Sequence, residues 1–160
     1  MERVNQIIQH EVFIRELKKL MRLEDERIYC RHDIDHLLSV ARIAYITALE
    51  EQLPLKKDII YAAALLHDVG RAAQYETGIP HEKAGARTAE MILKDCGFSG
   101  EEMDEILNAI GNHRSKENAQ EALLAKVLYD ADKKSRACFA CRAQASCDWP
   151  IEKKNFSIRR

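Results

Sequence analysis

The sequence predicts an all-α protein, a bundle of about six to seven helices. Only 6 Gly and 3 Pro interrupt its 160 residues, and aromatic residues make up only 6% of the chain. The apolar residues recur at helical spacing instead of alternating as they do in strands. With 46% hydrophobic residues, a chain of this length has the material for one compact domain with a single sizeable core.

The amino-terminal part of the chain is expected to form two amphipathic helices. Apolar residues at helical spacing predict the first helix over residues 4–21, and a short loop at residues 29–31 separates it from the second. The second helix is expected over residues 33–52, with Pro54 as its stop signal. His36 lies in its first turns.

The third expected helix, residues 58–69, is apolar on most of its surface, which predicts that it is buried. It ends at Gly70. Residues 71–80 contain glycine and proline and are predicted to form a loop. His81 then stands just ahead of a helix that continues to Lys94.

Two further helices complete the predicted bundle. Ser99, followed three residues later by Glu102, is a capping box and predicts the start of a helix that presents His113 at its end. The last helix is expected over residues 118–143. The tail after Pro150 is polar and basic.

The charge balance limits the partners that the chain can bind. Its 25 Lys and Arg nearly match its 26 Asp and Glu, so it lacks the basic field that holds a long nucleic acid, whereas a small anionic substrate fits. No apolar run approaches the length of a membrane span, and the first ten residues lack a signal-peptide core, so we expect a cytoplasmic protein without membrane contact. An odd number of cysteines, 5, argues against a disulfide framework and for free or metal-bound thiols.

His67 and Asp68 stand at the carboxyl end of a helix that is otherwise nearly all apolar. Burying an imidazole and a carboxylate there is unfavourable unless something pairs with them. A divalent metal ion would compensate, because imidazole nitrogen and carboxylate oxygen are ligands for zinc, manganese, iron, nickel or cobalt. The pair therefore predicts half of a metal site.

The remaining ligands must come from other helices, and His36 and Asp132 are the candidates. Asp132 follows Leu128 and Ala131 on the last helix, whose apolar face can direct its carboxylate inward. Asp130 competes for this role, but side chains two residues apart on a helix point about 200° apart, so only one of the two faces the site. Asp132 is the predicted ligand.

With these residues the sequence resembles the HD superfamily of metal-dependent phosphohydrolases, which is named after its consecutive His-Asp pair. The order typical of that family is an early His, a His-Asp pair that closes another helix, and a distant Asp on a late helix. His36, His67, Asp68 and Asp132 supply this order here. The resemblance covers roughly residues 31–136 and implies the all-α core of the family together with its divalent metal.

The predicted organisation is a single HD domain over residues 1–160, with a cysteine-cluster extension around residues 138–149. Two further histidines extend the resemblance. His81 is similar to the additional His that binuclear members place before a helix, and His113 to the ligand at the end of the next helix. Binuclear relatives have a His-His pair there, whereas this chain has Asn112 before His113. Either the two histidines bind a second metal, or they line the substrate pocket as acid or phosphate donors.

No nucleophile motif competes with the metal, so water is the expected nucleophile, and Asp68 is expected to accept a proton from it. Arg71, Arg114 and Lys133 each follow a proposed ligand position and are the predicted substrate-binding cations; the alternative is that they are solvated surface charges. Relatives that hydrolyse guanosine tetraphosphate carry an acidic pair shortly after their His-Asp. This chain has no acidic residue at positions 71–74, which disfavours that substrate.

Cys138, Cys141 and Cys147 are too concentrated in sequence to be ordinary core thiols. Thiolates at such spacing bind one zinc ion or an iron-sulfur cluster. Cys30 is the preferred fourth ligand and Cys96 the alternative, while three free thiols remain the other interpretation. A bound metal or cluster would be a structural staple or a redox sensor.

The leading hypothesis is therefore hydrolysis of a nucleotide or other small phosphate ester, as a phosphomonoesterase or phosphodiesterase, with one or two metal ions. A second hypothesis is a di-iron oxygenase on the same ligand scaffold. A third is a non-catalytic module that binds a ligand or senses redox state through the cysteines. The two remaining histidines, His10 and His32, lie outside the family pattern and are expected to be hydrogen-bonded core residues.

Overall fold

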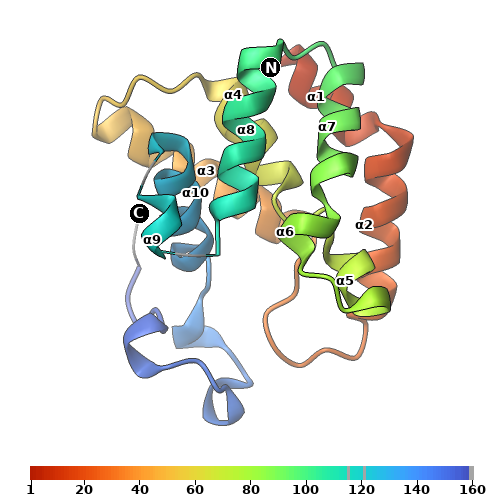
Figure 1. The fold of residues 1–160 in the computed structure, drawn as a ribbon. Helices are drawn as coiled ribbons and strands as arrows, with labels where there is room; N and C mark the ends of the chain where they lie inside the picture. Colours follow the sequence, from red (N-terminus) through yellow and green to blue (C-terminus); the bar gives the residue numbers. More distant parts are fainter. Residues whose placement is uncertain (115, 121, 159–160) are drawn as a thin grey trace.

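Helices account for the regular structure of the chain in the computed structural model, which describes residues 1–114, 116–120 and 122–158 (Figure 1). The α-helices are α1 (Glu2–Gln9), α2 (Glu11–Leu23), α3 (Ile34–Glu50), α4 (Lys57–Leu66), α5 (Arg71–Thr77), α6 (His81–Ala84), α7 (Ala86–Asp95), α8 (Gly100–Asn112), α9 (Lys116–Ala119) and α10 (Leu123–Lys134). Seven of them have eight or more residues, and the described residues contain no strand, which confirms the predicted fold class. None of these helices is long and apolar enough to cross a membrane.

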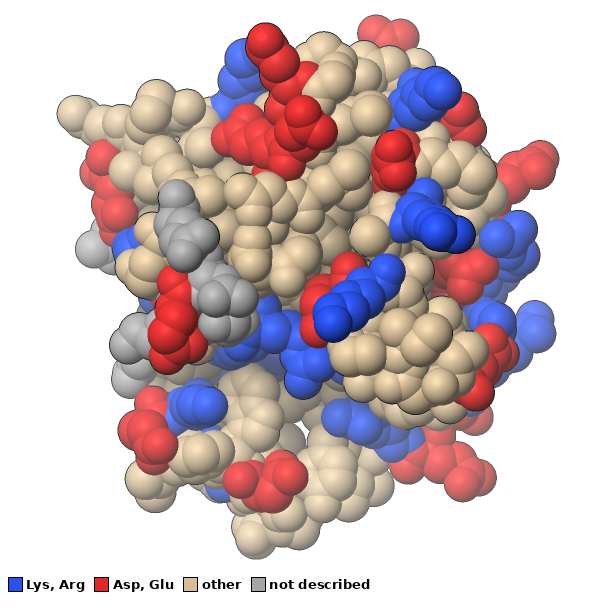
Figure 2. Space-filling model, in the orientation of Figure 1, with Lys and Arg blue, Asp and Glu red and all other residues tan. Residues whose placement is uncertain are grey.

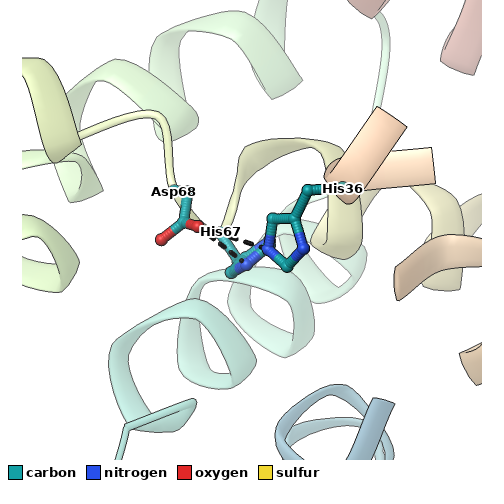
Figure 3. A group of neighbouring side chains, drawn as sticks. All are labelled: His36, His67 and Asp68. Carbon is teal, nitrogen blue, oxygen red and sulfur yellow. Dashed lines mark ion pairs between the residues drawn. The ribbon is translucent and has the colours of Figure 1, made fainter. Parts of the chain in front are cut away.

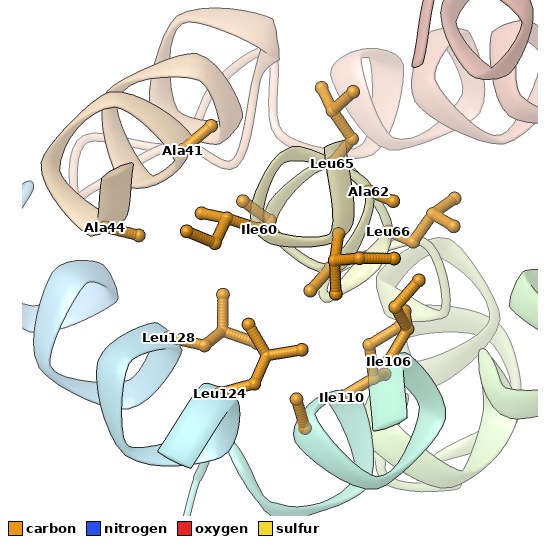
Figure 4. Close-up of a cluster of buried hydrophobic side chains, with 14 of the residues drawn as sticks. Ala41, Ala44, Ile60, Ala62, Leu65, Leu66, Ile106, Ile110, Leu124 and Leu128 are labelled. Carbon is orange, nitrogen blue, oxygen red and sulfur yellow. The ribbon is translucent and has the colours of Figure 1, made fainter. Parts of the chain in front are cut away.

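Helix α4 is the centre of the bundle. Its residues from Ala62 to Leu66 are at most 1% exposed, and they pack against α3, α8 and α10 (Figure 4). Full burial of each Leu or Ile side chain stabilises the fold by about 1.5–3 kcal/mol. Because α4 is held on all sides, the two residues that follow it, His67 and Asp68, are fixed in the interior.

Two of the predicted helix starts are formed as the sequence indicates. The Asp33 side chain accepts a hydrogen bond from the His36 backbone N–H at 3.0 Å, which caps α3. At the start of α8, Ser99 and Glu102 form the expected capping box. The first of these caps also orients the turn that carries His36.

The expected first helix, residues 4–21, is divided in two at His10. This residue has extended backbone angles (φ −67°, ψ 127°), and its Nδ1 accepts a hydrogen bond from the Val12 N–H at 3.2 Å. His10 is therefore a helix cap and not the core histidine that was expected. The break lets α1 and α2 bury separate apolar faces, with Ile7 on the first and Phe13 on the second.

Two other element predictions were wrong. Residues 71–80 contain helix α5, which ends where Gly78 adopts a left-handed conformation (φ 75°); the glycine marks the end of this helix and not a longer loop. The expected last helix over residues 118–143 is interrupted before α10, and residue 121 lies outside the described residues. Helix α10 then ends at Lys134, so Cys138 and Cys141 lie beyond it in short turns.

Glycine allows two backbones to touch beside α4. A Cβ atom on Gly70 would lie 2.2 Å from the carbonyl oxygen of His81 and 2.4 Å from the backbone nitrogen of Gly85. No side chain fits there, so the turn after α4 lies directly against α6. This close approach brings Asp68 beside His81.

The polypeptide after α10, residues 135–158, is here called the C-terminal segment. Its regular structure is limited to three 3-10 turns, η1 (Cys138–Ala140), η2 (Gln144–Ser146) and η3 (Ile151–Lys153). Asn155 fastens it by donating hydrogen bonds to the carbonyls of Lys133, at 2.7 Å, and Arg136, at 3.0 Å. The segment lies at the same end of the bundle as the loop between α2 and α3 (Figure 1).

Candidate metal centre

Four buried polar side chains converge from three parts of the bundle. His36 comes from α3, His67 and Asp68 from the end of α4, and Asp132 from α10, and each is at most 7% exposed. Figure 3 shows the first three pointing toward one another. The distances are 3.6 Å from His36 Nε2 to Asp68 Oδ2, 3.4 Å from His36 Nε2 to Asp132 Oδ1, 3.2 Å from His67 Nε2 to Asp68 Oδ2 and 4.0 Å from His67 Nε2 to Asp132 Oδ1.

These separations fit a divalent cation. With metal–ligand bonds of about 2.1 Å, neighbouring donor atoms lie about 3.0 Å apart in an octahedron and about 3.4 Å apart in a tetrahedron. His67 Nε2 and Asp68 Oδ2 are also buried and have no hydrogen-bond partner. Leaving such a group unsatisfied costs about 1–3 kcal/mol, and a shared cation would satisfy both.

The histidine rings are oriented so that their Nε2 atoms face the centre. In each ring Nδ1 lies against an oxygen acceptor, so in the neutral ring, the form that binds a metal, this nitrogen carries the proton and Nε2 keeps its lone pair. The acceptors are the Ala64 carbonyl for His67 (2.7 Å), the Ile110 carbonyl for His113 (2.6 Å), the Gln74 side-chain oxygen for His81 (2.6 Å) and the Ser135 hydroxyl for His36 (3.2 Å).

A second group of ligands shares Asp68 with the first. Asp68 Oδ1 lies 3.2 Å from His81 Nε2 and 3.9 Å from His113 Nε2, and the two Nε2 atoms are 3.0 Å apart. Two nitrogen lone pairs at that distance repel each other unless a cation or a proton lies between them. Arg71 Nε donates to the same carboxylate oxygen at 2.7 Å. The two oxygens of Asp68 thus serve two neighbouring ligand groups.

The centre favours positive charge. Burial raises the pKa of Asp68, but the charges of His67 and Arg71 outweigh it and hold that pKa well below its usual value. At Asp132 burial is also outweighed, here by the hydrogen bond from His36, and the pKa of the carboxyl is again lowered. Burial lowers the pKa of His67, yet the Asp68 carboxylate more than offsets this and the net shift is upward. Burial and the charge of His67 lower the pKa of His113 to about 3.

A cavity of about 640 Å³ opens beside the centre, with His113 and Asp132 in its wall. The three predicted substrate-binding cations, Arg71, Arg114 and Lys133, all line it. Four more cations line the same cavity, namely Arg27, Arg136, Lys153 and Lys154. Only two carboxylates do, so the wall is strongly positive, although the net charge of the whole chain is −1. Figure 2 shows Lys and Arg side chains along the hollow between the bundle and the C-terminal segment.

Two of these cations, Lys133 and Arg114, differ in how firmly they are held. Lys133 Nζ lies 2.5 Å from Asp132 Oδ2. Arg114 is half exposed and pairs with Glu82 at 3.5 Å. Asp130, the competitor of Asp132, points away from the centre and pairs with Lys126 at 3.7 Å.

Three residues that support the centre were missed in the sequence. Arg136 is buried, and its Nη2 lies 3.3 Å from both His36 Nε2 and Asp132 Oδ1. Its position four residues after Asp132 was a usable signal, because that is the spacing of a helical ion pair. Gln74 was hidden in a predicted loop. Ser135, whose hydroxyl donates to the Asp132 carbonyl at 2.7 Å, gave no recognisable signal.

A buried carboxylate beside the centre was also missed. Glu24 accepts hydrogen bonds from the His32 backbone N–H at 2.8 Å, from His32 Nδ1 at 2.7 Å and from the Tyr75 hydroxyl at 2.8 Å. Burial raises the pKa of Glu24, but its bonds to His32 outweigh this and lower it to about 2. Burial lowers the pKa of His32 to about 4, so a neutral imidazole donates to a carboxylate. His32 is thus a hydrogen-bonded core histidine, as expected.

The cysteines lie apart from both ligand groups. Cys30, Cys138, Cys141 and Cys147 are free thiols that line the cavity, whereas Cys96 is buried at the end of α7. No three of the described cysteine sulfurs lie within 4.8 Å of one another.

Comparison with known proteins links this geometry to one family. The HD domain model matches residues 33–137. An uncharacterized protein of Clostridium beijerinckii is 40% identical over 158 residues, which is 99% of each chain. A crystal structure from an uncultured Thermotogales bacterium, described as a predicted HD superfamily hydrolase, is similar with a TM-score of 0.67 and 27% sequence identity. The match covers 90% of this chain and 79% of the chain in that structure.

Part of the chain is also similar to larger proteins. Ribonuclease Y 1 of Pediococcus pentosaceus is 32% identical over 109 residues, and ribonuclease Y of Fervidobacterium nodosum is 35% identical over 101 residues. These matches cover 67% and 63% of this chain but only 19% and 18% of the ribonucleases. The similarity therefore concerns one region of each ribonuclease.

Proposed function

The chain belongs to the HD domain family of metal-dependent phosphohydrolases, and from this membership we propose that it hydrolyses a small phosphate ester, a nucleotide, with water as the nucleophile. One observation carries the proposal. Two of the unsatisfied buried atoms, His67 Nε2 and Asp68 Oδ2, belong to a ligand group beside a cavity whose wall contains seven cations and two carboxylates. A cation-binding group next to an anion-binding cavity is suited to phosphoryl chemistry.

His36, His67, Asp68 and Asp132 are the residues that would hold the metal ion. When bound, a divalent cation polarises a phosphoryl oxygen and acidifies water, which is the chemistry that ester hydrolysis needs. In this proposal Asp68 would accept the proton that the attacking water loses. His81 and His113 either hold a second ion against Asp68 Oδ1 or donate to the phosphate, and their 3.0 Å Nε2 separation favours the first role.

The cavity cations would bind the phosphate oxygens. Arg71 uses Nε to hold Asp68, which leaves its terminal guanidinium nitrogens for an anion. Arg114 is more than half exposed and its long contact to Glu82 is easily exchanged for a phosphate. Lys133 neutralises Asp132 at the cavity edge. Together they supply positive charge that stabilises the negative charge developing on the phosphoryl oxygens.

Aromatic side chains in the same cavity favour a nucleotide over a simple phosphate ester. Tyr29, Tyr129 and Trp149 line it, and Lys133 Nζ lies 5.2 Å from the Tyr129 ring centre and 5.9 Å from that of Trp149. A base stacked on such a ring contributes about 1–3 kcal/mol. The names of the ribonuclease relatives indicate a phosphodiester bond, so both monoesters and diesters are candidates.

The test compares two carboxylates on the same helix. Wild-type protein, Asp132→Ala and Asp130→Ala are assayed on p-nitrophenyl phosphate, bis(p-nitrophenyl) phosphate and a nucleotide panel, each with manganese, nickel, cobalt, zinc or iron. Hydrolysis should be lost in Asp132→Ala and kept in Asp130→Ala, because only Asp132 joins the ligand group. Asp68→Ala should also be inactive.

Three outcomes would overturn the proposal. Equal activity in the two helix variants would remove Asp132 from the chemistry. Nucleotide binding without turnover under every metal would favour a sensor module. Iron-dependent oxygen consumption would favour an oxygenase.

A further inference from the structure

Four of the five cysteines meet at one end of the molecule although more than a hundred residues separate the first from the others. Cys30 lies in the loop between α2 and α3, and Cys138, Cys141 and Cys147 lie in the C-terminal segment. All four line the large cavity, and the first three also line a smaller one of about 260 Å³. They are free thiols.

The other three thiols are near enough to affect the ionisation of Cys30. Burial raises the pKa of Cys30, Arg136 lowers it, and the charges of the other three cysteines raise it again. A hydrogen bond joins the two chain regions as well, because the Tyr29 hydroxyl donates to the Ser146 carbonyl at 3.2 Å. Cys30 directly follows Tyr29 and Cys147 directly follows Ser146, so this bond ties together the two regions that carry them.

The cysteines of the C-terminal segment lie at or next to the ends of its 3-10 turns. Cys138 begins η1, and the Cys141 N–H donates to the Cys138 carbonyl at 3.2 Å. Cys147 directly follows η2. Two cysteines separated by two residues across such a turn are the usual half of a structural zinc site.

Apart from hydrogen bonds such as those of Asn155 and Tyr29, the segment buries little apolar surface. Its buried apolar side chains are limited to Cys138 and Ala143, whereas Phe139, Ile151 and Ile158 are 52%, 75% and 91% exposed. In small folds that bury so little apolar surface, a disulfide or a metal usually supplies the missing stability. It also lies beyond the part of the chain that matches the HD domain, residues 33–137, apart from its first residues.

We propose that Cys30, Cys138, Cys141 and Cys147 together bind one zinc ion that fixes the C-terminal segment against the α2–α3 loop. Each thiol loses its proton on binding, and four thiolates fill the tetrahedral shell of zinc, so the site is structural and has no position for substrate. Sulfurs of a zinc site lie about 3.8 Å apart. No three of the described sulfurs lie within 4.8 Å of one another, so the turns would move inward when zinc binds.

The zinc site has a consequence for the cavity. The C-terminal segment contributes Trp149, Lys153 and Lys154 to the wall of the large cavity. The ligands of the HD centre, which are His36, His67, Asp68 and Asp132, come instead from the helical bundle. Loss of zinc should therefore raise the KM for a nucleotide and leave the metal content of the HD centre unchanged.

The experiment measures zinc in the full-length chain and in cysteine variants. Cys138→Ser and Cys147→Ser should each lose one zinc per chain. Cys96→Ser is the matched control and should lose none, because Cys96 lies at the end of α7 in the core. Cys147→His should retain zinc, since imidazole replaces thiolate as a ligand.

Cobalt substitution separates this site from the HD centre. Cobalt bound to thiolates gives a charge-transfer absorption that nitrogen and oxygen ligands do not give, and this absorption should disappear in Cys138→Ser and persist in Asp132→Ala. If Cys138→Ser loses structure, Cys147→His still tests the assignment, and limited proteolysis should cut the segment while the helical bundle stays intact.

The proposal is overturned by any of three results. The first is a wild-type protein whose thiols bind no zinc or cobalt, and the second is an equal zinc loss in Cys96→Ser. The third is iron with acid-labile sulfide at these cysteines, which would identify an iron-sulfur cluster.

Discussion

Replacing Gly70 by alanine tests whether the contact between the turn after α4 and helix α6 sets the geometry of the centre. The new Cβ would lie 2.2 Å from the His81 carbonyl oxygen and 2.4 Å from the Gly85 nitrogen. Both atoms belong to the backbone, so neither can move aside by a change of side-chain rotamer. Ordinary contact begins near 3.4 Å, so the two backbones must separate by about 1 Å.

That displacement acts on the ligands directly. Asp68 Oδ1 and His81 Nε2 are now 3.2 Å apart, and a metal site tolerates deviations of about 0.2 Å in its ligand distances. Gly70→Ala should therefore weaken metal binding at Asp68, and a displacement of 1 Å at a reacting centre lowers kcat/KM by about 100-fold. The forced contact should also destabilise the fold by about 1–3 kcal/mol.

Gly111→Ala is the matched control for this experiment. Gly111 lies within α8, and a Cβ there meets nothing within 4 Å. It should leave activity unchanged and stabilise the helix by about 0.5–1 kcal/mol. The assay is kcat/KM on a model phosphate ester at saturating metal, with metal content measured on the same samples. Wild-type activity and metal content in Gly70→Ala would refute the reasoning.

Two further predictions concern stability and substrate binding. Arg3→Ala should cost about 1 kcal/mol at pH 7, because Arg3 bonds Asp58 on α4 and Glu102 on α8 from its place on α1. The hydrogen bond from Arg3 lowers the pKa of Glu102 to about 2, below its usual 4.5, so this stabilisation is complete above pH 4.5 and is lost as the pH falls toward 2. Urea unfolding at pH 7 and pH 3 should show the difference between wild type and variant shrinking, and an equal difference at both values would contradict the assignment. Trp149→Ala should raise the KM for a nucleotide about tenfold, because about 1.4 kcal/mol of base stacking is lost. The KM for a phosphate ester without a base should stay unchanged. An equal change for both substrates would exclude stacking on Trp149.

Much of the fold follows from local patterns that the sequence displays. Apolar spacing defines α3, α4 and α8, and the capping box at Ser99 marks the start of α8 within one residue. Local pattern also favours Asp132 over Asp130, because one position shares a face with Leu128 and the other does not. These properties depend on neighbours within one helix, which is why a single sequence reveals them.

The remaining features depend on contacts between segments that are distant in the chain. Nothing near Gly70 indicates that His81 and Gly85 lie against it, and nothing near Gln74 indicates that its amide oxygen holds His81. Helix α5 was missed because Gly78 marks its end in the same way that it would mark a loop. Such features require the packed bundle, in which long-range neighbours decide the outcome.

The ends of helices explain why histidine is both a ligand and a structural residue here. The last four carbonyls of a helix lack partners within it. His67 follows α4 and binds the Ala64 carbonyl, and His113 follows α8 and binds the Ile110 carbonyl, each through Nδ1 and each three residues back. One hydrogen bond therefore satisfies a terminal carbonyl, fixes the tautomer of the ring and directs Nε2 to the centre. Because these bonds come from the helices themselves, both rings are held in place before any metal ion binds.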